Sequence, residues 1–341
     1  MTAISLAPEQ DSEVGRRLKA SFERYIDCSS LADQQIAELI RKLEIDILVD
    51  LKGFTRDSRP GAIARRPAPI AVNWLGYPGT MGAPYIDYII ADRTVIPEAE
   101  FGLYDEKVVW LPDSYQVNDS QRTIAAHTPT RRELDLPDDG FVFCCFNHSY
   151  KITPAIFDIW MRLLLRVDGS VLWLLEDNAL STRNLGLEAA RRGVAPQRLV
   201  FAPRVALADH LARHRAADLF LDTLPYNAHT TASDSLWAGL PIVTCLGATF
   251  AGRVAASLLK AIDIPELVTT TLDDYETLAL KLAQDPGFLA AMKAKLKSNR
   301  DSRPLFDTKR FTRNIESAYA AMWQTHQCGR RPESFAVGDG A

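Results

Sequence analysis

The chain reads Leu219-Phe220-Leu221-Asp222-Thr223-Leu224-Pro225-Tyr226-Asn227-Ala228-His229-Thr230-Thr231-Ala232-Ser233-Asp234 where an apolar strand runs through a polar turn into a helix. The first backbone N–H groups of a helix have no partner within it, and they carry the positive end of the helix dipole. This geometry binds phosphate groups. A competing interpretation is a helix cap in which Thr231 and Asp234 form a capping box. The stretch predicts a strand–turn–helix unit with either an anion site or a cap at its turn.

A second junction of this kind lies upstream, at Phe146-Asn147-His148-Ser149-Tyr150-Lys151-Ile152-Thr153-Pro154. An apolar strand ends at Phe146, and Pro154 is well tolerated in the first turn of the helix that follows. The helix dipole disfavours a cation such as Lys151 at this place unless an anion comes close. The position therefore favours an anion contact for Lys151 over a lysine that is merely solvated.

Strands and helices alternate along the chain. Apolar runs predict strands at 45–51, 70–75, 85–91, 107–111, 141–146, 171–175, 199–202, 219–221, 242–244 and 267–269. This alternation predicts an α/β protein with parallel sheets, whose ligands lie beyond the carboxyl ends of the strands. We expect five parts: a first Rossmann-like half (1–118), a polar linker (119–140), a second Rossmann-like half (141–305), a closing helix (306–325) and a disordered tail (326–341).

The composition narrows the class of protein. A chain of 341 residues with 47% hydrophobic and 24% charged residues is typical of a globular protein with two domains. A net charge of -4 without a basic stripe argues against a nucleic-acid partner. The cysteines have no metal-type spacing, and Cys144, Cys145 and Cys245 lie in apolar runs, as is typical of small core residues in a reducing compartment. Because neither a membrane span nor a signal peptide is evident, we expect no membrane contact and a cytoplasmic location.

Two further motifs precede these junctions: Arg65-Arg66-Pro67-Ala68-Pro69-Ile70 and Trp74-Leu75-Gly76-Tyr77-Pro78-Gly79-Thr80. In this order, the four motifs resemble the catalytic region of the protein O-linked N-acetylglucosamine transferases, the SPINDLY-like family. The resemblance extends from about residue 45 to residue 323. It implies a GT-B-type glycosyltransferase fold, in which two Rossmann-like halves face a cleft and the second half binds the nucleotide sugar.

The resemblance also implies site residues. Lys151 and His229 correspond to catalytic residues of the family, and Lys151 stands where relatives have a phosphate-contacting lysine. The residues that correspond to donor-binding positions are His148, His210, Arg213, Thr230, Thr231, Asp234, Leu75, Gly76 and Pro78. Among them, Asp234 matches the acid that binds the ribose hydroxyls, and His148 replaces a glutamine of many relatives.

Several of these positions have simpler interpretations. The alternative for Gly76 is that it forms a turn and has no contact with the donor. Arg56 and Arg59 follow a turn and could face an acceptor peptide, but loop arginines are often only solvated. His210 and His214 are four residues apart and could form a surface pair. A zinc site is not expected, since no third ligand is evident.

The beginning of the chain departs from the family pattern. Relatives start upstream with a strand that ends in an Asp-Phe-x-x-His-Pro type loop, and a helical repeat array usually precedes it. We therefore expect an incomplete N-terminal half and a helical-repeat region encoded upstream. The general base stays unassigned, with Asp46 and Asp113 as ionisable residues near strand ends.

These observations predict a glycosyltransferase that moves N-acetylglucosamine from UDP-GlcNAc to serine or threonine hydroxyls of a protein or peptide acceptor. The resemblance implies inversion at the sugar and no cofactor, and we expect no divalent metal. Protein O-fucosylation from GDP-fucose and a truncated, non-catalytic nucleotide-binding remnant are the alternatives. Neither a Gly-x-Gly-x-x-Gly loop nor a Walker lysine motif is present, which argues against NAD-dependent enzymes and P-loop ATPases.

Overall fold

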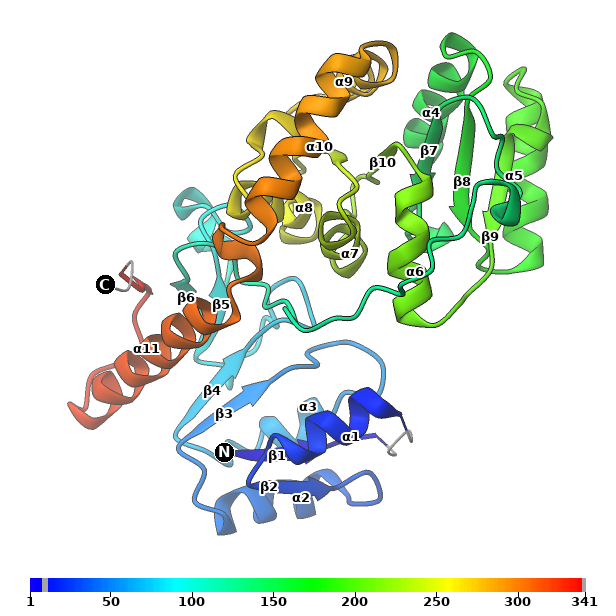
Figure 1. The fold of residues 1–341 in the computed structure, drawn as a ribbon. Coiled ribbons are helices and arrows are strands. Elements are labelled where there is room, and N and C mark those ends of the chain that lie inside the picture. Colours follow the sequence, from blue (N-terminus) through cyan, green and yellow to red (C-terminus); the bar gives the residue numbers. More distant parts are fainter. Residues whose placement is uncertain (8–11, 339–341) are drawn as a thin grey trace. The chain divides into compact units, whose positions relative to one another are not determined.

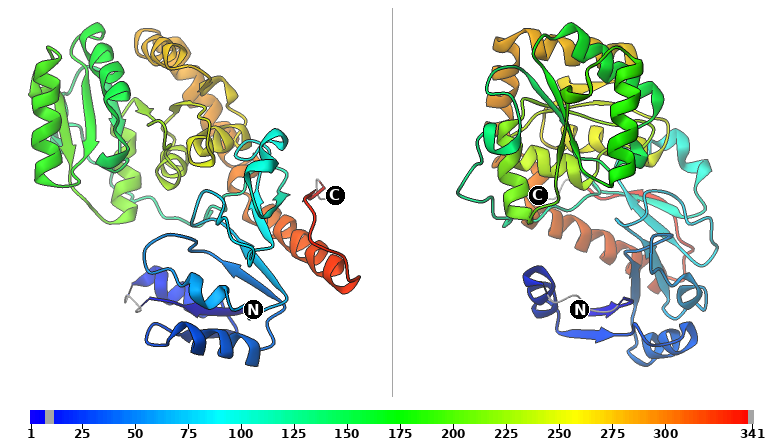
Figure 2. Two further views of the ribbon diagram at one scale, coloured as in Figure 1. Left: turned by 180° about the vertical axis from the view of Figure 1, so that it is seen from behind. Right: turned by 90° about the vertical axis from the view of Figure 1, so that its right-hand side faces the viewer.

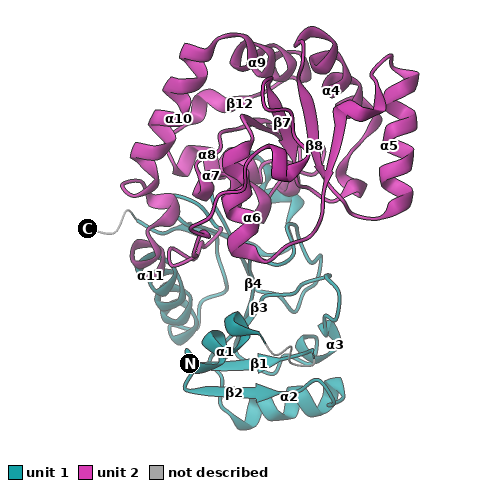
Figure 3. Ribbon diagram, turned by 45° about the vertical axis from the view of Figure 1, so that its right-hand side comes forward, with its two compact units in different colours: residues 1–115, 313–341 teal, residues 116–312 magenta. Residues whose placement is uncertain are grey.

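The computed structural model describes residues 1–7 and 12–338. The chain divides into two compact units, which are coloured separately in Figure 3. Unit 1 contains Met1–Tyr115 and Arg313–Ala341, and unit 2 contains Gln116–Thr312. Each unit is an α/β structure built on parallel strands (Figure 1), as the alternation of strands and helices predicts.

Unit 2 is built on a six-stranded sheet whose neighbouring strands are all parallel, in the order β12-β11-β10-β7-β8-β9. Its strands are β7 (Val142–Cys145), β8 (Val171–Leu175), β9 (Leu199–Ala202), β10 (Leu219–Leu221), β11 (Ile242–Cys245) and β12 (Val268–Thr269). Its helices are α4 (Pro154–Arg166), α5 (Ala179–Arg191), α6 (Leu207–Arg213), α7 (Thr230–Ala238), α8 (Val254–Ala261), α9 (Leu272–Gln284) and α10 (Pro286–Arg300).

The strands of this sheet are apolar and almost fully buried because helices cover both of its faces (Figure 2). Right-handed crossovers place α4 and α5 on one face and α6 and α7 on the other. From β7 the chain proceeds outward through β8 and β9, whereas from β10 it proceeds the opposite way through β11 and β12. The neighbours β7 and β10 therefore flank a topological switch point, where parallel sheets bind their ligands.

Unit 1 contains a parallel pair of strands and a five-stranded parallel sheet in the order β13-β6-β5-β4-β3. The strands are β1 (Thr2–Ser5), β2 (Arg24–Asp27), β3 (Ile47–Asp50), β4 (Ile70–Asn73), β5 (Tyr88–Ala91), β6 (Lys107–Trp110) and β13 (Phe335–Ala336). The helices are α1 (Glu13–Ala20), α2 (Asp33–Lys42) and α3 (Pro60–Ile63), while α11 (Thr308–Gln327) begins in unit 2 and ends in unit 1.

Short 3-10 helices lie in the connections of both units. They are η1 (Glu98–Leu103), η2 (Arg132–Leu134), η3 (Ser149–Lys151), η4 (Pro196–Arg198), η5 (His214–Ala216), η6 (Phe250–Gly252), η7 (Pro265–Leu267) and η8 (Pro304–Phe306). None of the helices in residues 1–7 and 12–338 combines the length and apolar character that crossing a bilayer requires.

The C-terminal segment is more ordered than the sequence predicts. We expected a disordered tail at 326–341, but α11 continues to Gln327 and β13 pairs with β6. The ring of Phe335 packs edge-on against Tyr88 with a centroid distance of 6.3 Å, and the backbone N–H of Val337 donates to the Trp110 carbonyl over 2.9 Å. These contacts order the segment; residues 339–341 lie outside the described residues.

The polar segment 119–140, which the sequence predicts as a linker, belongs to unit 2 and packs on it. The Arg131 guanidinium donates to the Ala216 carbonyl over 3.0 Å and pairs with the Asp218 carboxylate over 2.7 Å. Leu136 of the same segment is buried. Polar composition alone did not distinguish a free linker from a segment that is held by hydrogen bonds. That the N-terminal half is incomplete stays a prediction.

Candidate active site

Asp222 follows β10 and organises the turn between β10 and α7. One carboxylate oxygen accepts from the backbone N–H groups of Ala228, over 2.6 Å, and Thr223, over 2.7 Å, while the other accepts from the Thr244 hydroxyl over 2.6 Å. Asp222 is buried, and burial raises the pKa of its carboxyl to about 7. No role is predicted for Asp222 from the sequence, although an acid directly after a buried strand is a usable signal.

Asn147, two residues after β7, joins this turn to the start of α7. Its amide nitrogen donates to the Thr223 hydroxyl over 2.8 Å, and its amide oxygen accepts from the Thr231 hydroxyl over 2.5 Å. The ends of β7 and β10 and the N-terminus of α7 are thereby fixed to one another. Buried hydrogen bonds of this kind make the geometry of the switch point rigid.

The capping interpretation of Thr231 and Asp234 is wrong. The Thr231 hydroxyl donates to Asn147, and the Asp234 carboxylate pairs with Arg122. Within residues 1–7 and 12–338, no side chain forms a capping hydrogen bond at the N-terminus of α7. The backbone N–H groups of Ala232 and Ser233 donate to the His229 carbonyl, so those of Thr231 and the exposed Thr230 remain available to an anion.

Lys151, in η3, is folded against the turn and is not a freely solvated lysine. Its ammonium donates to the Asn227 carbonyl over 2.8 Å and lies 4.0 Å from the centroid of the Tyr226 ring. Burial lowers the pKa of the Lys151 ammonium to about 8, which the nearby Asp222 carboxylate partly opposes. A partly desolvated cation is thus held next to the turn that leads into α7.

His229 occupies the N-cap position of α7 and is neutral near pH 7. Burial, together with the charge of Lys151, lowers the pKa of its imidazole to about 3. Its Nε2–H therefore donates to the Ala251 carbonyl over 3.1 Å, which leaves Nδ1 as an acceptor. The ring stacks on Tyr226 with a centroid distance of 4.9 Å, so Tyr226 contacts both Lys151 and His229.

His210 and Arg213, in α6, form a second polar group on unit 2. The Arg213 guanidinium donates to Nδ1 of His210 over 2.6 Å and lies 4.7 Å from the centroid of the Phe146 ring. Burial lowers the pKa of His210 to about 4, so the ring is neutral and Nε2 carries its proton. A neutral, edge-anchored imidazole can stack on a planar base.

The interpretation of His210 and His214 as a surface pair is wrong. His214 is fully buried, and its Nδ1–H donates to the His210 carbonyl over 2.7 Å. Burial lowers the pKa of His214 to about 3. His214, the first residue of η5, is therefore an interior residue whose hydrogen bond supports the backbone of His210 in α6.

His148 is exposed and lies beside a second acid. Its Nδ1 is 3.1 Å from Asp177, which also accepts from the Ser149 hydroxyl over 2.7 Å. The hydrogen bond from Ser149 is the largest of the influences that lower the pKa of Asp177 to about 2. Because His148 precedes η3 directly, it lies at the same edge of the sheet as Lys151. Its role in donor binding stays a prediction.

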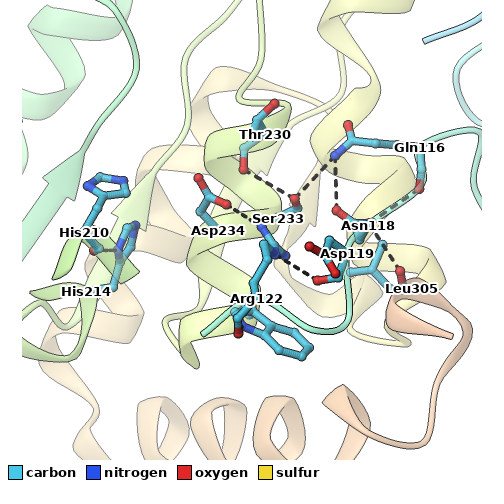
Figure 4. A network of polar contacts seen from close by, with 11 residues as sticks. Gln116, Asn118, Asp119, Arg122, His210, His214, Thr230, Ser233, Asp234 and Leu305 are labelled. Carbon is cyan, nitrogen blue, oxygen red and sulfur yellow. Dashed lines mark hydrogen bonds and ion pairs between the residues drawn. The ribbon is translucent and has the colours of Figure 1, made fainter. Parts of the chain in front are cut away.

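Asp234 pairs with Arg122, which lies in the segment predicted as a linker (119–140) and is not among the predicted site residues. Figure 4 shows the contact, in which the two side chains approach to 2.5 Å. Burial raises the pKa of Asp234 to about 6, while Arg122 opposes the shift. No motif marks Arg122, so the sequence offered no signal for it.

The loop after β4 in unit 1 carries Leu75, Gly76 and Pro78. Leu75 has a φ of 74°, a conformation that a non-glycine residue rarely adopts. A Cβ atom on Gly76 would lie 1.9 Å from the Leu51 carbonyl oxygen, so the close approach of two backbones requires glycine here. The loop lies at the carboxyl end of its sheet, and its contact with a donor sugar stays a prediction.

The two arginines predicted for the acceptor side differ from each other. The Arg59 guanidinium pairs with Asp33 over 2.5 Å and donates to the Leu31 carbonyl over 2.7 Å, so it is not a solvated loop arginine. Arg56 is exposed, and Asp57 lies 3.8 Å from its guanidinium. A role for either in acceptor binding stays a prediction.

Comparison with known proteins identifies the relatives of this chain. The sequence model of glycosyl transferase family 41 matches residues 1–129 and 121–315. The protein SEC of Arabidopsis thaliana, named a probable UDP-N-acetylglucosamine–peptide N-acetylglucosaminyltransferase, is 38% identical over 98% of this chain and 35% of its own length. The chain spans about a third of the length of the curated relatives it matches.

Solved structures agree with this finding. An O-GlcNAc transferase of Thermobaculum terrenum, a lysine-to-methionine mutant, is 34% identical with a TM-score of 0.89 over 96% of this chain and 62% of that chain. HepE of Anabaena, solved with UDP and glucose, is 13% identical with a TM-score of 0.65 over 94% of this chain and 91% of that chain, a likeness of fold alone. These matches confirm the family resemblance and the α/β fold of the GT-B type.

Proposed function

The chain belongs to glycosyl transferase family 41, and we propose that it transfers N-acetylglucosamine from UDP-N-acetylglucosamine to serine or threonine hydroxyls of proteins. The observation that carries the proposal is the convergence of Lys151, His229 and the uncapped N-terminus of α7 at the switch point of unit 2. Neutral imidazole, ammonium and backbone N–H groups in one place suit a diphosphate leaving group.

The chemistry requires stabilisation of the departing UDP. When the bond from the sugar to the diphosphate breaks, negative charge grows on the phosphate oxygens. Lys151 and the first N–H groups of α7 are already oriented, so they stabilise this charge without reorganisation. The approaching anion raises the pKa of Lys151 from its value of about 8 and keeps the ammonium charged.

These groups place positive charge where other glycosyltransferases use a divalent ion, so the proposal includes no metal and no cofactor. An acceptor hydroxyl attacks the anomeric carbon from the face opposite the diphosphate, which inverts its configuration. The residue that accepts the hydroxyl proton stays unassigned.

The remaining contacts concern the uridine. We assign His210 to the base, because its neutral ring is held in place by Arg213, and Asp234 to the ribose hydroxyls. The names of the relatives favour UDP-N-acetylglucosamine over GDP-fucose as the donor. The four buried cysteines are free thiols, which supports a cytoplasmic location.

Calorimetry with UDP and GDP on the purified chain tests the donor site. UDP should bind and GDP should not, and added chelator should leave the UDP affinity unchanged. Transfer of labelled N-acetylglucosamine to a peptide library then tests the reaction. Negligible heats for both nucleotides would contradict the proposal, whereas UDP binding without transfer would favour a nucleotide-binding protein without turnover.

A further inference from the structure

The pair Arg122–Asp234 is one of the most buried ion pairs among the described residues of unit 2. The side chain of Arg122 is 10% exposed and that of Asp234 is 8% exposed. Nη1 of Arg122 donates to Oδ1 of Asp234 over 2.5 Å. Among the described residues, the hydrogen bond of this pair reaches Oδ1 and not Oδ2, and Nη2 of Arg122 is buried without a hydrogen-bond partner. One oxygen is therefore anchored and the other is left for another donor.

The surroundings of Arg122 hold the guanidinium in place. Its Nε donates to the Asp119 carbonyl over 3.1 Å, and the Trp237 indole N–H donates to the Arg122 carbonyl over 3.2 Å. The guanidinium carbon lies 5.4 Å from the Trp237 ring centroid and 5.9 Å from that of Phe306. Figure 4 shows Arg122 between Asp119 and Asp234, beside α7. The backbone hydrogen bonds and the two aromatic rings therefore hold Arg122 beside Asp234.

The segment that carries Arg122 is itself tied to α7. Gln116 donates to the Ser233 hydroxyl over 3.4 Å, and Asn118 donates to the Leu305 carbonyl over 3.2 Å. Both side chains are buried. Hydrogen bonds from Gln116 and Asn118 thus fix the segment that positions Arg122 beside Asp234. Arg122 itself lies in the part of the chain that composition predicts as a linker, 119–140.

We propose that Arg122 is a positioning residue for nucleotide binding: it keeps the Asp234 carboxylate ionised and oriented, so that Oδ2 can accept hydrogen bonds from the ribose hydroxyls. The inference rests on the proposed function, since it takes a uridine nucleotide as the ligand. A protonated carboxyl would present an O–H to the ribose and would lose acceptor strength. Burial pushes Asp234 toward that protonated form, and Arg122 opposes it.

Few other charges act on the pair. The Asp119 carboxylate attracts Arg122. The charged group that acts on the Asp234 carboxyl is Arg122, which lowers its pKa against the effect of burial. Arg300, from α10, lies 5.4 Å from the centroid of the Trp237 ring but pairs with the exposed Asp301. Arg300 therefore provides a matched control, because it contacts the same indole without contacting Asp234.

UDP affinity measured between pH 6.5 and 8 tests the inference. Without Arg122 the pKa of the Asp234 carboxyl should rise, and UDP affinity falls about tenfold per pH unit below the pKa of a required carboxylate. Relative to the unmodified chain, Arg122→Met should therefore bind UDP about tenfold more weakly at pH 6.5 and within about twofold at pH 8. Titration of the UDP phosphate and of Lys151 affects all variants alike and cancels in this ratio. Arg122→Lys should restore the affinity, and Arg300→Met should leave it unchanged.

A double variant and a folding check complete the experiment. Asp234→Asn should weaken UDP binding, and adding Arg122→Met to it should introduce no further dependence on pH. Far-ultraviolet circular dichroism checks that each variant is folded. If Arg122→Met loses affinity equally at every pH, or not at all, the positioning role is overturned and the donor site stands. If the unmodified chain does not bind UDP, the proposed function falls first.

Discussion

Two loops at carboxyl ends of parallel strands are built in different ways. In unit 2, the turn from Asp222 to His229 is held by buried polar side chains, chiefly the Asp222 carboxylate and the Asn147 amide. In unit 1, the loop after β4 is shaped by the backbone, with Leu75 in a left-handed conformation and Gly76 pressed against Leu51. The comparison shows that the same place in a parallel sheet can be organised by hydrogen bonds or by steric fit.

The difference matters for chemistry. A buried polar network changes the proton affinity of its members: in the turn of unit 2 and the adjacent η3, the pKa of Asp222 rises to about 7, that of Lys151 falls to about 8 and that of His229 falls to about 3. Steric fit defines only a shape. We therefore expect electrostatic variants to act on unit 2 and volume variants to act on the loop of unit 1.

The largest effect is expected for Asp222→Ala. The change leaves two backbone N–H groups and the Thr244 hydroxyl without their buried acceptor, and each costs about 1–3 kcal/mol. The free energy of unfolding in urea should fall by at least about 3 kcal/mol, and UDP binding should be lost. As control, Asp158→Ala removes a half-exposed acid paired with Arg192 and should cost less than about 1 kcal/mol. Equal losses in the two variants would show that Asp222 does not organise the turn.

Lys151→Ala should have the next largest effect. A charge-assisted contact is worth about 1.5–3 kcal/mol, so UDP affinity should fall by about 10- to 100-fold. Lys281→Ala is the matched control, because Lys281 also lies over an aromatic ring, 4.4 Å from the Phe288 centroid, on the outlying helix α9. Unchanged affinity in Lys151→Ala would remove the lysine from the donor site.

The lowered pKa of Lys151 gives this prediction a second measurement. Free Lys151 loses its proton near pH 8, and a bound diphosphate raises its pKa. Between these two values the bound state holds more protons, so UDP binding at pH 8 should take up protons. Calorimetry in two buffers of different ionisation enthalpy detects the uptake. Lys151→Ala should abolish it, and an uptake that persists in this variant would assign it to another group.

Gly76→Ala sharpens the steric side of the comparison. The added Cβ meets the Leu51 carbonyl at 1.9 Å, so two backbones must separate. Overpacking of this kind costs about 1–3 kcal/mol, and the loss should appear in urea unfolding while UDP binding by unit 2 is retained. Gly79→Ala is the control, since its Cβ would meet Tyr77 at 3.5 Å, an ordinary contact. A Gly76→Ala variant as stable as Gly79→Ala would contradict the steric account.

The smallest effect is expected for Thr231→Val. The change keeps the shape of the side chain and removes the hydroxyl that donates to Asn147 over 2.5 Å. A single hydrogen bond contributes about 1 kcal/mol, so unfolding free energy should fall by about that amount. Thr230→Val, at an exposed position of the same turn, should change stability by less than about 0.5 kcal/mol. If both variants are equally stable, the bridge from β7 to α7 contributes nothing measurable.

The sequence by itself determined the alternation of strands and helices, and it placed Lys151 and His229 at strand ends. These features are local: a buried strand needs a continuous apolar run, and a strand-to-helix junction leaves polar residues at fixed offsets. The order of the unit 2 sheet, with β7 beside β10, then brought both residues to one switch point.

Only the tertiary structure decided which polar groups meet. Arg122 and Asp234 are 112 residues apart, and Asn147 and Thr231 are 84 apart, so no local pattern connects them. Burial also decided the charge states. At His210, for example, burial lowers the pKa of the imidazole to about 4, whereas a histidine surrounded by water keeps its ordinary, higher pKa. A hydrophobic pattern records which residues avoid water, whereas partners and proton affinities depend on which segments the sheet order brings together.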